Sequence, residues 1–245
     1  MATFTLSNSQ VSLELVESPA GVYPTKIVSG TEEINFAESS LWTVVHVLEG
    51  SAYASVTDLV INGTTSIIPS DFTTCSTDTF GGSTSAVTSY SGQTKITGET
   101  INVSSIVYLD NDEVAFNIKI EQSGSTSGSI FAVSYPSLFV KDIHRTAAEN
   151  NKLVYCDRGG RLISDPKIKG NTNGINPSFS ASMQFMALYD ITSKHMLYLQ
   201  SKDSEGYRKD LATQAKLTET RMFFTQYPEN NIVPNITYEL SLIHI

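Results

Sequence analysis

Short runs that alternate apolar and polar residues fill most of the chain. From Gln10 to Glu17 (QVSLELVE) nearly every second side chain is apolar, and similar alternation occurs from Asn102 to Tyr108 and from Val114 to Ile120. This pattern is typical of antiparallel strands with one face on a core and the other in water. The run from Trp42 to Leu48 (WTVVHVL) is more continuously apolar, which predicts an interior strand.

Turn residues separate these runs and predict hairpins. Asn62-Gly63 lies between two β-branched runs, where both residues can adopt the positive φ of a tight turn. The acidic segment from Asp110 to Glu113 is predicted to be another hairpin tip. Two further apolar runs, Met183 to Tyr189 and Met196 to Gln200, flank a polar segment that begins at Asp190 and predict a hairpin with a longer turn.

Helical patterns are short. Arg145 to Asn151 and Asp210 to Lys216 could each form a turn or two, but neither sustains an apolar stripe at helical spacing. No internal repeat of fixed period is visible, which disfavours propellers and solenoids. We therefore expect an all-β protein, a large antiparallel two-sheet sandwich with a few short helical turns.

Composition indicates a folded chain with a sizeable core. Of the 245 residues, 40% are hydrophobic and 17% are charged, which excludes an intrinsically disordered chain. The formal net charge of −9 argues against nucleic acid as a partner, because such binding depends on clustered Lys and Arg. A neutral ligand such as a sugar is compatible with this charge.

The two cysteines and the N-terminus give few further constraints. Cys75 and Cys156 lie far apart in the sequence, and we expect two free thiols. The N-terminal residues have no basic start and no apolar core, so neither a secretory signal nor a membrane helix is expected there. No other stretch is long and apolar enough to span a bilayer.

Sequence motifs for metal or catalytic sites are not matched. The acidic hairpin tip lacks the spacing and the glycine of an EF-hand loop, and the histidines are scattered, so no metal and no cofactor is predicted. His46 lies in an apolar strand and is expected to be a core histidine. Asp190 would lie near Asp203 if the hairpin forms, but Asp is common in turns, and we assign no catalytic residues.

Six segments share an order and a spacing with a known family: Ser40 to Trp42, Phe131 to Leu138, Arg158 to Ile163 with Asp165-Pro166, Met183 to Asp190, Leu197 to Leu199, and Asp203 with Gly206 to Lys209. Together they resemble the N-terminal domain of a group of large multidomain glycoside hydrolases. This domain has the galactose-mutarotase-like supersandwich fold, and the resemblance spans roughly residues 5 to 240.

The resemblance implies an accessory domain. In such enzymes a (β/α)₈ barrel carrying the catalytic carboxylates follows the sandwich, and no alternation of strands and helices follows here. We therefore expect one domain over residues 1–240, a tail at 241–245 that arises from truncation or cloning, and a missing C-terminal barrel as partner. The implied compartment is extracellular or periplasmic. Aldose epimerases of this fold use a His and a Glu, and neither motif is matched.

The polar segment after the second hairpin is the candidate contact site. Asp203, Glu205, Tyr207, Arg208 and Lys209 either form a solvated loop with weak ion pairs or abut a sugar or the barrel. In the second case Tyr207 would stack on a pyranose ring while Asp203 and Lys209 bond hydroxyl groups. The alternative to a hydrolase domain is a free-standing carbohydrate-binding module, such as a lectin-like or viral receptor-binding sandwich.

Overall fold

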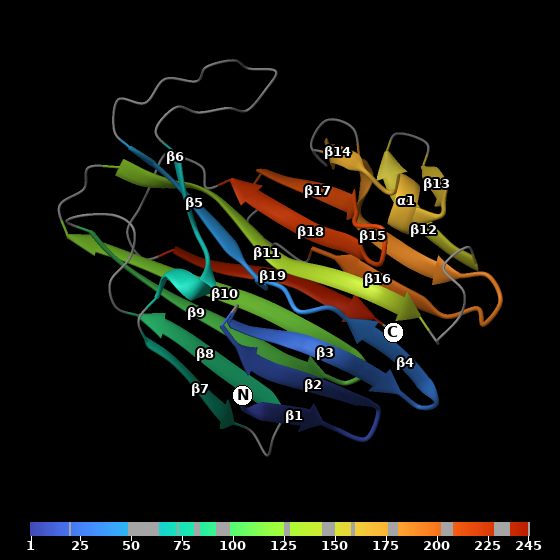
Figure 1. The fold of residues 1–245 in the computed structure, drawn as a ribbon, viewed down its shortest axis with the longest axis horizontal. Helices are drawn as coiled ribbons and strands as arrows, with labels where there is room; N and C mark the ends of the chain where they lie inside the picture. Colours follow the sequence, from blue (N-terminus) through green and yellow to red (C-terminus); the bar gives the residue numbers. More distant parts are fainter. Residues whose placement is uncertain are drawn as a thin grey trace.

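Strands stacked in two sheets make up most of the protein (Figure 1). The structure is a computed structural model, and it describes residues 1–19, 21–48, 64–72, 74–80, 84–91, 99–124, 128–143, 150–157, 160–175, 181–201, 208–227 and 236–244. All strand pairs described are antiparallel, and helix is limited in these residues to η1 (Pro69–Asp71) and α1 (Pro166–Lys169). The predicted all-β sandwich with short helical turns is confirmed.

We call the sheet turned toward the viewer in Figure 1 the front sheet. The described strands follow one another across it in the order β1 (Thr3–Ser7), β2 (Val11–Ser18), β3 (Gly21–Ser29), β4 (Glu32–Phe36), β11 (Gly128–Ile143), β18 (Thr220–Tyr227), β17 (Arg208–Ala215) and β14 (Thr172–Ile175). Strand β11 is 16 residues long and pairs with β4 near one end and with β5 (Thr43–Leu48) near the other. Strand β5 also pairs with β6 (Thr64–Ile67), so it is an interior strand as predicted.

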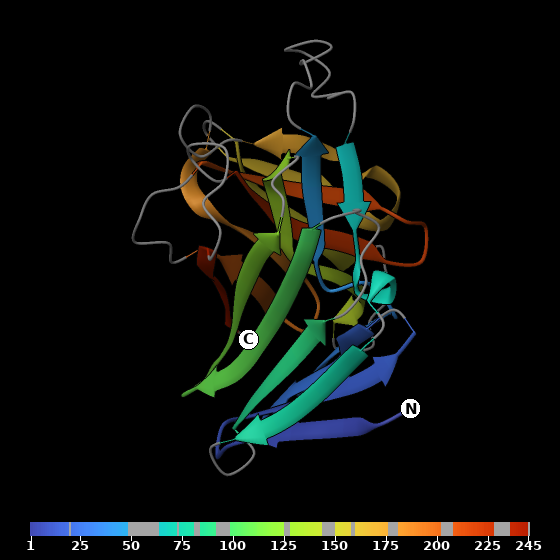
Figure 2. The ribbon, with the colours of Figure 1, turned by 90° about the vertical axis from the view of Figure 1, so that its left-hand side faces the viewer.

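The back sheet lies behind it. Its described strands have the order β13 (Arg161–Ser164), β12 (Asn151–Asp157), β15 (Ala181–Asp190), β16 (Met196–Gln200), β19 (Ile236–His244), β10 (Glu113–Gly124), β9 (Glu99–Asp110), β8 (Ser85–Ser91) and β7 (Thr74–Phe80). The view in Figure 2, turned by 90°, shows β5 and β6 on one side of the molecule and β9 and β10 on the other.

The core lies between the sheets and follows the alternation in the sequence. In β2 the inward residues Val11, Leu13 and Leu15 are at most 2% exposed, while the residues between them are half-buried. Trp42 packs edge-on against Tyr90, with ring centroids 5.2 Å apart, and joins the front-sheet side of the core to β8. Such aromatic pairs add to the stabilisation from area burial alone.

Three buried tyrosines connect the sheets by hydrogen bonds. The Val22 N–H donates to the Tyr90 hydroxyl at 3.1 Å, and the Tyr155 hydroxyl donates to the Leu211 carbonyl at 3.0 Å. Tyr135 reaches from β11 to β9, where its hydroxyl lies 3.0 Å from that of Ser105. Each of these contacts joins a front-sheet strand to a back-sheet strand, so the spacing of the sheets is fixed by directional bonds as well as by packing.

Most predicted hairpins are present. The turn between β9 and β10 contains Asn111 with φ 56°, and β15 pairs with β16. Asp190 closes the second turn, because its Oδ1 accepts the N–H groups of Thr192 at 3.0 Å and Ser193 at 2.7 Å. The expected Asn62-Gly63 turn lies outside the described residues.

The two predicted helical turns have different outcomes. The helical turn expected from Asp210 to Lys216 is wrong, because this segment continues β17 between β14 and β18. Its inward residues Leu211 and Thr213 are two residues apart and each 1% exposed. This two-residue spacing is that of a strand, and pairing with the neighbouring strands stabilises it. Most of the helical turn expected from Arg145 to Asn151 lies outside the described residues.

The end of the chain forms part of the back sheet. Residues 241–244, which were expected to be a tail, belong to β19, and that strand pairs with β10 and β16. The expected free thiols are found, since Cys75 and Cys156 are both unpaired, and His46 is fully buried in β5 as expected for a core histidine. No helix in the described residues is long and apolar enough to cross a membrane.

Candidate functional site

The predicted contact segment is described only in part. Asp203, Glu205 and Tyr207 lie outside the described residues. Arg208 begins β17, where its backbone is opposite Tyr227 of β18. The contacts of the segment before β17 stay a prediction.

Lys209 has a different environment from the solvated loop that the sequence suggested. It is 2% exposed, it is opposite the buried Gln226 in β18, and its Nζ donates to the Ser201 hydroxyl at 3.1 Å. The next residue, Asp210, lies on the other face of the sheet and accepts a 2.8 Å bond from the Tyr227 hydroxyl. Lys209 therefore anchors the start of β17 in the core.

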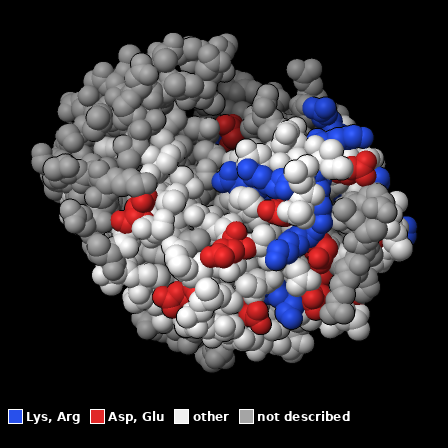
Figure 3. All heavy atoms as spheres, viewed as in Figure 1, with Lys and Arg blue, Asp and Glu red and all other residues white. Residues whose placement is uncertain are grey.

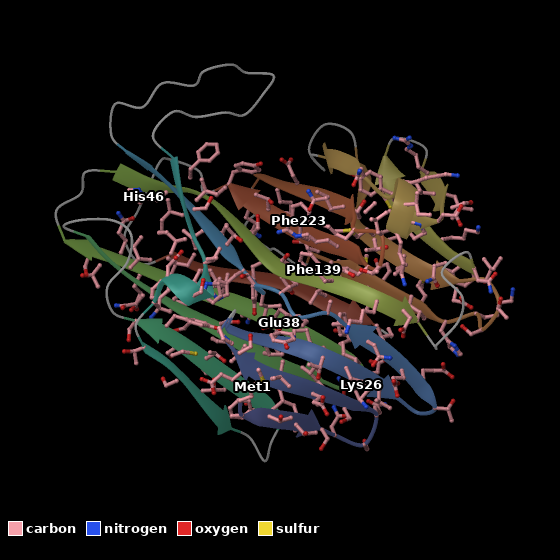
Figure 4. All side chains as sticks on the ribbon, in the orientation of Figure 1. Met1, Lys26, Glu38, His46, Phe139 and Phe223 are labelled. Carbon is pink, nitrogen blue, oxygen red and sulfur yellow. The ribbon has the colours of Figure 1, made fainter. Side chains whose placement is uncertain are left out.

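The outer face of the front sheet, by contrast, carries accessible polar and aromatic side chains. In β18 the residues Arg221, Phe223, Thr225 and Tyr227 are half-buried, whereas the residues that alternate with them are buried. Figure 4 labels Phe223, Phe139, Glu38 and Lys26, which follow one another across this face from β18 to β3. Figure 3 shows Lys and Arg gathered over one half of the face, with Asp and Glu among and beside them.

A pocket of about 550 Å³ opens on this face. It is formed by residues of β2, β3, β4 and β11 together with the segment after β4: Glu14, Tyr23, Thr25, Lys26, Asn35, Phe36, Glu38, Lys141 and Asp142. A volume of this order is typical of small-molecule sites. Two register shifts shape it, one in the pairing of β2 with β3 and one in that of β11 with β4. Bulges of this kind re-aim side chains that a regular ladder would place evenly.

Hydrogen bonds hold the polar lining in place. Asn35 donates from Nδ2 to Asp142 Oδ1 at 3.1 Å and to Glu33 Oε1 at 2.9 Å. The Thr25 hydroxyl donates to Glu14 Oε1 at 2.5 Å. The carboxylates of Glu14 and Asp142 are therefore fixed before a ligand arrives, and each has acceptor capacity left for hydroxyl groups.

The electrostatics of the pocket are close to balanced. Two lysines, Lys26 and Lys141, and three carboxylates, Glu14, Glu38 and Asp142, line it. Burial, and then the negative charge of Glu38, raise the pKa of the Tyr23 phenol, so its hydroxyl stays protonated and can donate. A rim with many donors and acceptors but little net charge suits a polyhydroxylated ligand.

An arginine cluster, Arg221 with Phe139, Phe223 and Ser137, lies beside the pocket. The Arg221 guanidinium carbon is 4.1 Å from the ring centroid of Phe223 and 5.4 Å from that of Phe139. Its Nε donates to the Ser137 hydroxyl at 2.8 Å. Burial lowers the pKa of Arg221, but a guanidinium stays charged well above neutral pH. The cluster presents a rigid cation framed by two rings.

The described residues contain no metal-ligand cluster. No group of three or more His, Cys, Asp or Glu side chains is arranged there to hold an ion. The acidic tip from Asp110 to Glu113 forms a hairpin turn, and the prediction that it is a turn is confirmed. What the face offers chemically is hydrogen bonding, stacking and one fixed positive charge.

The residues of the pocket and the arginine cluster were not identified from the sequence. They come from segments as distant as Glu14 and Arg221, and only the pairing of β4 with β11 and of β11 with β18 brings them together. The sequence could have indicated only which residues of each alternating strand point outward. Lys26 and Lys141 occupy such outward positions beside bulges, which single-strand periodicity does not locate.

Comparisons with solved structures identify the fold. No protein-family model matches the chain, and no curated protein matches it at the sequence level. The α-N-acetylgalactosaminidase NagBb from Bifidobacterium bifidum, solved with Gal-NHAc-DNJ, superposes with a TM-score of 0.65 and 11% identity, over 99% of this chain and 35% of that chain. A variant of the GH36 α-galactosidase AgaA from Geobacillus stearothermophilus gives a TM-score of 0.56 and 8% identity, over 99% of this chain and 40% of that chain.

A free-standing protein is also similar. The galactose mutarotase related enzyme from Lactobacillus acidophilus has a TM-score of 0.59 and 10% identity, over 99% of this chain and 96% of that chain. This chain thus spans about a third of the length of the NagBb hydrolase it matches, and nearly the whole of the mutarotase-related enzyme. At these identities the likeness shows the fold alone, and the fold is the galactose-mutarotase-like supersandwich predicted from the sequence.

Proposed function

We propose that the chain is a non-catalytic accessory domain of a glycoside hydrolase, and that the outer face of its front sheet contacts carbohydrate. The observation that carries the proposal is the pocket of about 550 Å³ on that face. Its charges are nearly balanced, and hydrogen bonds already hold the carboxylates of Glu14 and Asp142 in place. The likeness to about a third of a larger hydrolase supports the accessory role. In that role the domain also supports a C-terminal catalytic barrel.

Binding of glycans to the isolated chain tests the proposal. A glycan array with terminal galactose and N-acetylgalactosamine, the sugars in the names of the similar hydrolases, should identify a ligand, and titration calorimetry should then measure its affinity. Asp142→Asn and Glu38→Gln each remove a charged acceptor from the pocket and should weaken binding at least about tenfold, or about 1.4 kcal/mol.

A matched control comes from the back sheet. Glu121 is 42% exposed and pairs with Lys119 on β10, away from the pocket, so Glu121→Gln should leave the affinity unchanged. An array without any bound glycan would contradict carbohydrate contact by this domain. Equal weakening by the pocket and control variants would contradict the assignment of the pocket.

The predicted segment before β17 needs its own test within this proposal. In a full-length hydrolase with this domain, alanine at the positions of Asp203 and Tyr207 should change either kinetics or stability. If kinetics and stability are both unchanged, the segment neither contacts sugar nor supports the barrel.

A second candidate is a free-standing carbohydrate-binding protein. It is favoured by the match to a mutarotase-related enzyme over 96% of that protein's length, because the same fold occurs there without a barrel. The sequence of the gene beyond Ile245 distinguishes the two. An alternating strand and helix pattern with paired carboxylates supports the accessory domain, and a stop codon at that point supports the free-standing protein.

A further inference from the structure

Arg221 has no negatively charged partner in the described part of the chain. Its Nε is bonded to Ser137, and its Nη1 lies 3.5 Å from Gln214 Oε1, which is at the limit of a hydrogen bond. The second terminal nitrogen, Nη2, makes no bond to the described residues. The chain has 25 acidic and 16 basic residues, so the lack of a carboxylate at this arginine is not due to a shortage of acids.

The unpaired guanidinium is also partly removed from water. Arg221 is only half-buried as a residue, but the rings of Phe139 and Phe223 cover its charged end. Taking a charge out of water without a counter-ion is unfavourable, and stacking and the bond to Ser137 offset only part of that cost. An anion beside the terminal nitrogens of Arg221 would supply the missing counter-charge. The lowered pKa of Arg221, which burial causes, agrees with a charge that lacks such a partner.

The geometry of the cluster favours an anion with two acceptor oxygens. A guanidinium whose Nε is occupied still offers the parallel N–H groups of its two terminal nitrogens, a fork that matches two oxygens of an anion such as a carboxylate. The rings and Ser137 hold this fork in one orientation, so less conformational freedom is lost when a ligand binds. A lysine at this position would supply a charge without the fork.

The cluster is next to the pocket. Phe139 and Lys141 are two residues apart on β11, and Lys141 lines the pocket. Phe139 is opposite Arg221 in the register of β11 with β18. A sugar in the pocket could therefore place a substituent beside Arg221.

We propose that the ligand of this face is an acidic glycan containing a uronic acid, and that Arg221 binds its carboxylate through both terminal nitrogens. The inference rests on the proposed function and narrows its ligand class. The neutral part of the sugar occupies the pocket, whose two lysines and three carboxylates leave no excess of positive charge for an anionic group. The acidic group is directed to Arg221, which has no carboxylate partner among the described residues.

Titration calorimetry with matched ligands tests this inference. The probes are galacturonate oligosaccharides, the same oligosaccharides with methyl-esterified carboxyl groups, and poly-L-glutamate. The free acid should bind at least tenfold more tightly than the methyl ester, and its affinity should fall as salt is raised. Arg221→Lys should lose most of this preference, because the charge remains but the fork does not, while Lys119→Gln on the back sheet should retain it.

The possible outcomes separate the inference from the proposed function. If the ester and a neutral galactoside bind as well as the acid, or if Arg221→Lys keeps the full preference, the inference is wrong while carbohydrate binding stands. If no glycan of either charge binds, the proposed function fails with it. If poly-L-glutamate binds as tightly as the uronate, the partner is an acidic protein and the inference is also wrong. Circular dichroism confirms that each variant is folded before titration.

Discussion

The hydroxyl groups of Tyr135 and Ser105 lie 3.0 Å apart in the core and join the front sheet to the back sheet. The Tyr135 hydroxyl also donates to the Ile106 carbonyl at 3.3 Å. Tyr135 and Ser105 are 0% and 3% exposed, so water cannot replace either partner. Because β11 carries Tyr135 inward and Phe139 and Lys141 outward, this contact also fixes the strand on which the pocket and the arginine cluster are built.

Removal of the Tyr135 hydroxyl should therefore destabilise the protein. Tyr135→Phe removes the hydrogen bonds to Ser105 and to the Ile106 carbonyl and leaves the Ser105 hydroxyl without that partner, at a cost of about 1 to 2 kcal/mol. Urea unfolding at pH 7 measures it. Tyr198→Phe is the matched control, because Tyr198 is half-buried at the surface and bonds Gln200 at 3.1 Å; a loss there equal to that at Tyr135 would contradict the importance of burial.

The buried tyrosines should also limit stability at high pH. Burial raises the pKa of both Tyr90 and Tyr135 above the usual value of 10.0. Below pH 10 both phenols are protonated in the folded and unfolded chains, and the stabilising contribution is fully present. Above pH 10 the unfolded chain releases protons that the folded chain retains, so the free energy of unfolding should fall as pH rises.

Unfolding curves from pH 8 to pH 12 would measure this dependence. The double variant Tyr90→Phe with Tyr135→Phe should be less stable at pH 8 but should lose less stability between pH 10 and pH 12 than the wild type. Parallel pH dependences for the two proteins would show that these tyrosines do not control alkaline unfolding.

Leu217 is a position where substitution should stabilise the protein. It is 80% exposed and has a φ of 63°, in the left-handed region that a side chain disfavours by about 1 kcal/mol. Leu217→Gly or Leu217→Asn should raise the free energy of unfolding by roughly 0.5 to 1 kcal/mol. Leu162→Asn, at an exposed leucine of β13 without positive φ, is the control and should bring no such gain.

Gln226 is a second such position. Its side chain is fully buried, neither amide atom has a hydrogen-bond partner among the described residues, and it lies opposite Val133 in β11. Gln226→Met keeps a similar volume without the unsatisfied groups and should stabilise the chain by roughly 1 to 3 kcal/mol. Thermal unfolding measures it, and a clear loss of stability would mean that the amide has a partner such as a bound water.

The sequence predicted the fold well because strand periodicity and turn chemistry are local signals. The alternation in β2 and the turn at Asn111 required no knowledge of distant residues. The segment from Asp210 to Lys216 misled because its residues have adequate helix propensity, and pairing on both sides decided for strand. Short α1 was not predicted, since four residues leave no periodic pattern.

The candidate site could not be predicted in the same way. Phe139 and Arg221 are adjacent only because β11 pairs with β18, and no local pattern encodes that pairing. Lys209 looked like part of a solvated polar loop because its sequence neighbours are polar, yet its position in β17 turns it into the core. The register of strands that are distant in the sequence determines both the contact of Phe139 with Arg221 and the burial of Lys209.

Mapping of the contact surface tests the central claim most directly. Backbone amide chemical shifts of the isotope-labelled chain, recorded while the tightest glycan from the array is added, report which residues meet the ligand. The account predicts that the largest changes occur on the outer face of the front sheet, at Lys26, Asp142 and Phe223. Changes confined to the back sheet, or no changes at saturating glycan, would contradict it.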